Sequence, residues 1–159
     1  MKIKDNGEEI QIYDFNVLEA FKIARKLERE GISFYKKLTE AAKDPKVKEV
    51  LKYLLDEEEE HLQIFERMIE GEDPDSLDDS GEDVTDIVET GVFAMPDNNE
   101  ELTADMDKAL ELGITIERKS LAFYLEVLKH TESEEGKNAL KKVIGEEEKH
   151  WEELKRLVK

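Results

Sequence analysis

The 159-residue chain contains no cysteine, only three prolines and few aromatic residues, which make up 7% of it. The absence of cysteine excludes disulfides, thiolate zinc sites, iron–sulfur clusters and a cysteine nucleophile, so any bound metal must be held by oxygen and nitrogen. Charged residues, mostly Glu and Lys, make up 42% of the chain. Little proline and many charges favour long helices with charged outer faces over a sheet sandwich. We therefore predict an all-α fold.

Basic residues are also in short supply, because 24 Lys and Arg face 42 Asp and Glu and give a net charge of −18. Nucleic-acid binding needs a basic face, so we expect no nucleic-acid partner. No apolar run approaches the roughly 18 residues that span a bilayer, and the first fifteen residues lack the apolar core of a signal peptide. We expect a cytoplasmic protein with no membrane partner.

The two ends of the chain superimpose, without a gap, when the sequence is shifted by 89 positions. Phe, Tyr and His are scarce here, yet they keep the same register. The pairs are Glu28 with Glu117, Phe34-Tyr35 with Phe123-Tyr124, Glu57-Glu58-Glu59 with Glu146-Glu147-Glu148, and His61 with His150. The two halves therefore look like copies of one duplicated unit.

Each unit has the pattern of a helical hairpin. Apolar periodicity predicts helices over about residues 16–42, 45–70, 103–129 and 134–158. Asp44 supplies an N-cap and Pro45 a first-turn residue for the second helix, which Gly71 is expected to end. Thr131 and Ser133 are candidate caps for the fourth helix.

The hairpins, about residues 16–70 and 103–159, are separated by an acidic segment over 71–102, with one short helical stretch near 83–89. A helix of about 25 residues is about 37 Å long, so a connection of this length lets the second and third helices run parallel. One long crossover between two short loops is typical of ferritin-like bundles. We predict a single ferritin-like four-helix-bundle domain over 1–159; the alternative is two hairpins that meet in a dimer.

Six polar residues fall where the apolar stripes of these helices call for core residues. They are Glu28, Glu58, His61, Glu117, Glu147 and His150. Burying four bare carboxylates would cost several kcal/mol each, and no lysine or arginine is expected at the neighbouring inward positions. Two divalent cations would balance the four charges and leave both imidazoles neutral. The alternative is a polar core network closed by hydrogen bonds.

The spacing of these residues favours the metal site. Glu-x-x-His places both side chains on one helical face, and it occurs on two helices, at Glu58/His61 and Glu147/His150. Two such motifs plus one Glu from each other helix make the di-iron carboxylate arrangement. The donor set suits two iron ions, with manganese or zinc as alternatives.

The same motifs resemble those of the rubrerythrin branch of the ferritin-like superfamily. The resemblance covers both hairpins and rests on Glu28 with Tyr35, Glu117 with Tyr124, LLDEEEEHLQIFE around Glu58 and His61, and VIGEEEKHWEEL around Glu147 and His150. It implies two bridging metal ligands, Glu58 and Glu147, and four terminal ones, Glu28, Glu117, His61 and His150. Tyr35 and Tyr124 would hydrogen-bond the carboxylates and orient them.

Two departures qualify what the resemblance implies. Rubrerythrins carry a rubredoxin domain whose four cysteines hold an electron-transfer iron, so here the electrons would come from an external electron-donor protein. Their third helix has a further glutamate at the position of Ser120.

The resemblance implies a homodimeric di-iron oxidoreductase that reduces hydrogen peroxide or oxygen. The alternatives are a ferroxidase that handles iron as ferritins do, and a bundle that its metals only stabilise, without catalysis.

Overall fold

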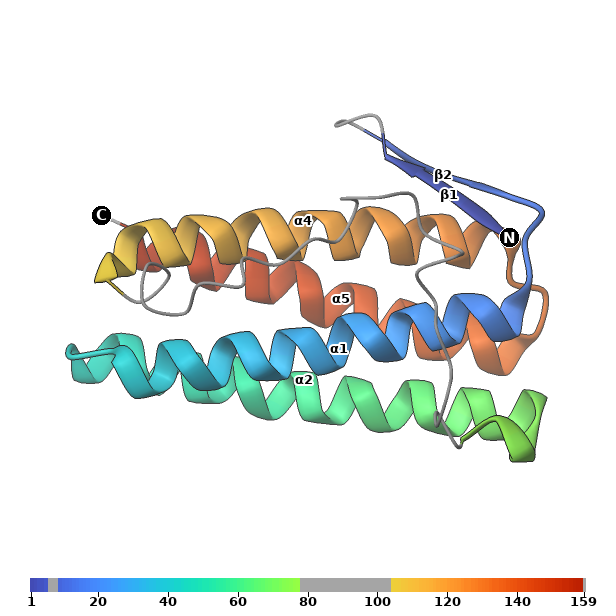
Figure 1. The fold of residues 1–159 in the computed structure, drawn as a ribbon, viewed down its shortest axis with the longest axis horizontal. Helices are drawn as coiled ribbons and strands as arrows, with labels where there is room; N and C mark the ends of the chain where they lie inside the picture. The colour runs from blue at the N-terminus through green and yellow to red at the C-terminus, as the bar shows by residue number, and fades with distance from the viewer. Residues whose placement is uncertain (6–8, 78–103, 159) are drawn as a thin grey trace.

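The computed structural model, which describes residues 1–5, 9–77 and 104–158, is built around four long helices that lie side by side (Figure 1). They are α1 (Val17–Ala41), α2 (Pro45–Glu72), α4 (Met106–His130) and α5 (Glu134–Leu157). α1 and α2 form one antiparallel hairpin, α4 and α5 form the other, and α2 and α4 run in the same direction. The predicted all-α four-helix bundle is confirmed.

The link between the two hairpins begins with η1 (Pro74–Leu77), a single 3₁₀ turn after α2. Most of the predicted crossover, and the short helix predicted near 83–89, lie outside the described residues. Among the residues that the structure does describe, no helix is both long and apolar enough to cross a bilayer.

Side-chain caps start the helices close to the predicted positions. Asn16 accepts a hydrogen bond from Glu19 N at 2.9 Å at the start of α1. Asp44 accepts one from Lys46 N at 2.9 Å at the start of α2. Ser133, and not Thr131, caps α5, because its hydroxyl accepts a hydrogen bond from the Gly136 amide at 2.9 Å.

The predicted end of α2 at Gly71 is wrong, because the helix continues through this glycine to Glu72. A glycine ends a helix by adopting a left-handed conformation, but a helical glycine costs only about 1 kcal/mol relative to alanine. The C-cap is Asp73, whose amide donates to Ile69 O at 2.9 Å.

The prediction missed a small antiparallel sheet before the first helix, made of β1 (Lys2–Asp5) and β2 (Ile10–Tyr13). Its alternating isoleucines, Ile3, Ile10 and Ile12, are buried, and β2 packs against α4 (Figure 1). Asp14 then turns the chain into α1 with φ at +50°.

The apolar core consists of two clusters, one towards each end of the bundle. The first contains Phe21, Phe65, Tyr124, Leu140 and the isoleucines of the sheet. The second contains Phe34, Tyr35, Leu51, Leu110 and Leu154. On every helix one cluster precedes and the other follows a buried glutamate, so the polar residues form a layer between the two clusters.

Candidate metal centre

All six predicted ligands lie in this polar layer, and none of them is more than 4% exposed. Each helix contributes at least one carboxylate, and the two histidines come from α2 and α5. The six are Glu28 on α1, Glu58 and His61 on α2, Glu117 on α4, and Glu147 and His150 on α5. They form two overlapping groups, in each of which one donor atom per residue lies within 4.8 Å of the others.

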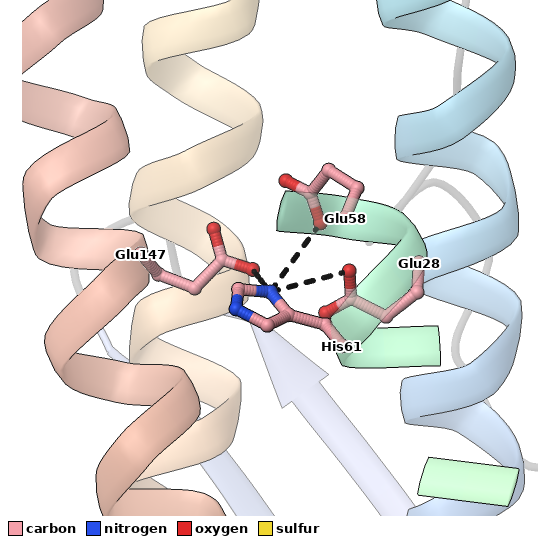
Figure 2. A group of neighbouring side chains, drawn as sticks. All are labelled: Glu28, Glu58, His61 and Glu147. Atoms are coloured by element: carbon pink, nitrogen blue, oxygen red, sulfur yellow. Dashed lines mark hydrogen bonds and ion pairs between the residues drawn. The ribbon is translucent and has the colours of Figure 1, made fainter. Parts of the chain in front are cut away.

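The first group contains Glu28, Glu58, His61 and Glu147 (Figure 2). His61 Nδ1 is its centre and lies 3.1 Å from Glu147 Oε1. The same nitrogen is 3.7 Å from Glu28 Oε2 and 3.7 Å from Glu58 Oε2. Three carboxylate oxygens and one imidazole nitrogen thus converge on one small volume.

The second group contains Glu58, Glu117, Glu147 and His150. His150 Nδ1 lies 3.1 Å from Glu147 Oε2, 3.5 Å from Glu58 Oε1 and 3.9 Å from Glu117 Oε1. The two groups share Glu58 and Glu147, each of which turns one oxygen to each histidine. This is the disposition that a carboxylate bridging two metal ions requires.

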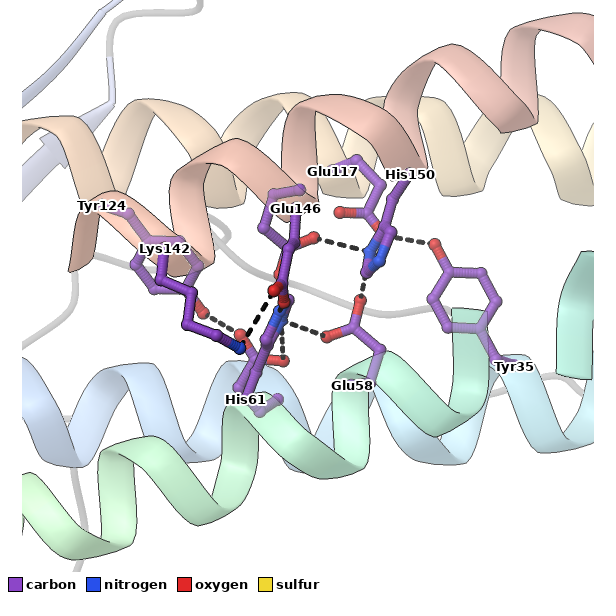
Figure 3. A network of polar contacts seen from close by, with 10 residues as sticks. Tyr35, Glu58, His61, Glu117, Tyr124, Lys142, Glu146 and His150 are labelled. Carbon is purple, nitrogen blue, oxygen red and sulfur yellow. Dashed lines mark hydrogen bonds and ion pairs between the residues drawn. The ribbon is translucent and has the colours of Figure 1, made fainter. Parts of the chain in front are cut away.

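Two buried tyrosines hold the remaining carboxylates, and each reaches across from the other hairpin. The Tyr124 hydroxyl donates to Glu28 Oε1 at 2.6 Å, and the Tyr35 hydroxyl donates to Glu117 Oε1 (Figure 3). Burial and the adjacent carboxylate raise the pKa of both tyrosines well above the ordinary value, so they stay protonated donors. Each hydroxyl fixes the orientation of one glutamate.

The carboxylates of the site fall into two electrostatic classes. Burial, together with repulsion from Glu58 and Glu147, raises the pKa of Glu28 and of Glu117 well above the ordinary value. Burial also opposes ionisation of Glu58 and Glu147, but hydrogen bonds from their neighbours, both histidines included, outweigh it and hold the pKa of both below the ordinary value. The shared pair therefore carries the negative charge.

The two histidines carry the matching positive charge. Burial would lower their pKa values, but hydrogen bonds to the carboxylates, that to Glu147 foremost, raise the pKa of His150 to about 9 and that of His61 further. Without metal, the raised pKa values favour a proton on each histidine and on Glu28 and Glu117, and the lowered pKa values favour the ionised forms of Glu58 and Glu147. Two divalent ions would replace these four protons at no net change in charge.

The donor set fits metal ions better than it fits a closed hydrogen-bond network. Glu28 Oε2 is buried and, among the described residues, has no hydrogen-bond partner, although it belongs to the first group. Buried polar atoms seldom lack a partner, and a metal ion would supply one. Four carboxylates and two imidazoles, without thiolate, suit hard or borderline divalent ions.

Sequence reasoning missed three polar residues near the site. Glu146 Oε2 lies 2.7 Å from His61 Nε2, and Glu57, Glu146 and His61 form a third group of potential ligands. The repeat could have indicated these two glutamates, because they are equivalent under the 89-residue shift. Arg25, one turn before Glu28, is 2% exposed, so the expectation that no basic residue takes a neighbouring inward position is wrong. No signal in the sequence separated it from the exposed arginines.

Comparisons with known proteins bear on the fold and on the family of the chain. A search among curated proteins found no match. A structure from Thermotoga maritima, bearing the name of a ferritin-like diiron-carboxylate protein, is 21% identical with a TM-score of 0.69, over 92% of this chain and 97% of that one. A hypothetical protein from Pyrococcus furiosus is 23% identical with a TM-score of 0.71, over 90% and 88% of the two chains. These likenesses show the fold.

The family assignment comes from the sequence as a whole. The family model for rubrerythrin matches residues 19–158, which include all four helices apart from the first two residues of α1. All six buried carboxylate and imidazole side chains, and both tyrosines bonded to them, lie inside the match. The resemblance inferred from the motifs is thereby confirmed: the chain belongs to the rubrerythrin family.

Proposed function

We propose that the chain holds two iron ions between its hairpins and uses them to reduce hydrogen peroxide or oxygen with electrons from a separate donor protein. The observation that carries the proposal is the shared carboxylate pair, since Glu58 and Glu147 each direct one oxygen to each histidine. Terminal ligands are Glu28 and His61 for one ion, and Glu117 and His150 for the other.

Two ferrous ions can supply the two electrons that convert hydrogen peroxide, with two protons, to two molecules of water. The chain's own residues hold and shield the site. Tyr35 and Tyr124 fix the outer carboxylates, and the two apolar clusters above and below the polar layer keep bulk water out. Where bulk water is excluded the effective dielectric constant is low, so the charges on the ligands act on the metals with little screening.

The electron donor and the assembly complete the proposal. The electron donor is proposed to be a separate protein, since the sequence contains no cysteine that could hold an electron-transfer iron. Family resemblance favours a homodimer, which light scattering can test.

One specific observation supports a second candidate, a ferroxidase that takes ferrous iron as its substrate. Ser120, on α4, occupies the position where rubrerythrins carry an additional ligand glutamate. This chain therefore lacks one metal ligand that the peroxidase reaction of rubrerythrins uses. A ferroxidase also needs no donor protein, because the substrate iron supplies the electrons.

Stopped-flow spectroscopy separates the two functions. The protein is reconstituted anaerobically with ferrous iron and mixed with hydrogen peroxide or with oxygen, and the absorbance of oxidised iron is followed. Oxidation faster with peroxide than with oxygen supports the peroxidase. Faster oxidation by oxygen, with turnover under excess ferrous iron, would favour the ferroxidase. Bound iron that neither oxidant changes would leave only a stabilising role for the metals.

A matched pair of variants ties the reaction to the site. Glu147→Gln keeps the shape of a bridging side chain but removes its charge, and we expect it to abolish iron oxidation. Glu148→Gln changes the adjacent, exposed glutamate and should oxidise iron as the wild type does. Circular dichroism of both metal-free variants checks that they fold.

A further inference from the structure

The two metal subsites have matching inner ligands but different surroundings at the outer nitrogens of their histidines. His61 Nε2 lies 2.7 Å from Glu146 Oε2, and Lys142 Nζ lies 3.0 Å from the other oxygen of that carboxylate (Figure 3). The lysine holds the carboxylate, and the carboxylate holds the imidazole. Among the residues that the structure describes, this chain of contacts is found at His61 and not at His150.

The duplication predicts the same arrangement around His150, but the described residues do not form it. The residues equivalent to Glu146 and Lys142 are Glu57 and Tyr53. Tyr53 hydrogen-bonds Glu57, which raises the pKa of the tyrosine to about 12. Within the described part of the chain, His150 Nε2 is buried with no hydrogen-bond partner, and its ring meets the edge of Tyr53 at 6.3 Å between centroids.

A carboxylate on the outer nitrogen changes what the inner nitrogen can bind. With Nε2–H donating to Glu146, the lone pair of His61 Nδ1 is free for a metal and the ring is held in place. His150 lacks both effects.

We propose that Glu146 is a positioning residue that makes the subsite of Glu28 and His61 bind its metal first and more tightly than the subsite of Glu117 and His150. The inference rests on the proposed two-metal site and adds an order of filling to it. A partner of this kind is typically worth 10- to 100-fold in metal affinity. The duplicated centre is thus unequal in function although its inner ligands are matched.

Anaerobic titration with Co²⁺, followed by calorimetry and by visible absorbance, tests the inference without any turnover. The wild type should show two binding steps whose dissociation constants differ by about 10- to 100-fold. Glu146→Ala should weaken the tighter step by about that factor and make the steps merge. Glu148→Ala, which changes an exposed glutamate of the same helix, should change either step less than about threefold.

Two further variants assign the step to a subsite. Glu117→Ala removes a ligand of the second subsite, so one tight step should remain and should still weaken when Glu146→Ala is added. Glu28→Ala removes a ligand of the first, and adding Glu146→Ala should then have no effect. The melting temperatures of the metal-free variants show whether a loss of affinity is only a loss of folding.

The outcomes separate this inference from the proposed function. Two Co²⁺ ions bound with equal affinity, or equal effects of Glu146→Ala and Glu148→Ala, would overturn the order of filling and leave the two-metal site intact. Absence of Co²⁺ binding in the wild type would overturn both.

Discussion

The α1–α2 hairpin and the α4–α5 hairpin are alike where they face each other and unlike elsewhere. Towards the site, each hairpin supplies one terminal glutamate, one Glu-x-x-His pair and one tyrosine that is hydrogen-bonded to the terminal glutamate of the other hairpin. Outside, the sheet of β1 and β2 packs into the cluster at one end of the bundle, and among the described residues only His61 has a carboxylate on its outer nitrogen. The inner positions of the two hairpins thus match under the 89-residue shift, whereas these outer positions do not.

Removing the bridging carboxylates is the strongest test of whether the two hairpins contribute equally to the metal site. Glu58→Ala and Glu147→Ala should each reduce bound metal from about two ions per chain to fewer than about 0.5, because each carboxylate serves both ions. Removing a terminal carboxylate, as in Glu117→Ala, should leave about one. Elemental analysis after anaerobic reconstitution measures the content, with Glu59→Ala as an exposed control. If Glu58→Ala and Glu147→Ala each kept one ion, the bridging role would be refuted.

A pH series on the metal-free protein tests the charge balance between the halves. The pKa of His150 is raised to about 9 from 6.5, so its protonation stabilises the fold below the unfolded value, and this contribution is lost as pH rises through about 9. The loss is on the order of 3 kcal/mol, and ionisation of Glu28 and Glu117 acts in the same direction. Unfolding free energy should therefore fall between about pH 7 and 10.

The metal-loaded protein serves as the control for this series, because its ligands are already deprotonated. Its stability should change little between pH 7 and 10 and should fall in acid, where protons compete with the metals. Urea denaturation at each pH measures both forms. Parallel curves for the two forms would contradict the balance of imidazolium and carboxylate.

A substitution in the sheet tests whether this outer feature of the bundle affects stability without affecting the metal site. Ile3 is fully buried in the first cluster, so Ile3→Ala should cost about 2 to 4 kcal/mol of unfolding free energy in urea. Bound metal should stay at the wild-type level, since no atom of the sheet belongs to the site. Lys2→Ala, an exposed change on the same strand, should cost less than about 0.5 kcal/mol. Loss of metal in Ile3→Ala would mean that the sheet supports the centre directly.

The tyrosines give the smallest and most symmetric effect. Tyr35→Phe and Tyr124→Phe each remove one buried hydrogen bond to a carboxylate and should each cost about 1 to 3 kcal/mol in the metal-loaded protein. Thermal unfolding compares the two variants side by side. Costs that differ by more than about 2 kcal/mol would show that the hairpins are unequal inside as well.

Local signals explain which parts of the fold could be predicted. The caps Asp44 and Ser133 and the apolar stripes fixed the helices within a few residues, since both signals act within one turn. The predicted end of α2 at Gly71 is wrong because a glycine marks a helix end only when tertiary structure lets the chain turn there. The isoleucines of the sheet alternate as a strand requires, but eight strand residues are a weak signal beside four long helices.

The candidate site could be predicted as far as its residues lie on apolar stripes. Glu58 and His61 stand where Leu or Val is due, which periodicity detects. Glu146 lies on the edge of its stripe and resembles any exposed glutamate, and its contact with His61 depends on how α5 packs against α2. Arg25 is buried for reasons that one helix alone does not reveal.

In the proposed centre, two metal ions lie between the hairpins and share Glu58 and Glu147. An anomalous difference map at the iron absorption edge, from crystals of protein reconstituted anaerobically with ferrous iron, tests it most directly. We predict two peaks, one beside His61 Nδ1 and one beside His150 Nδ1, with a bridging carboxylate on either side of the pair. A single peak, or peaks held by Glu57 and Glu146 instead, would contradict it.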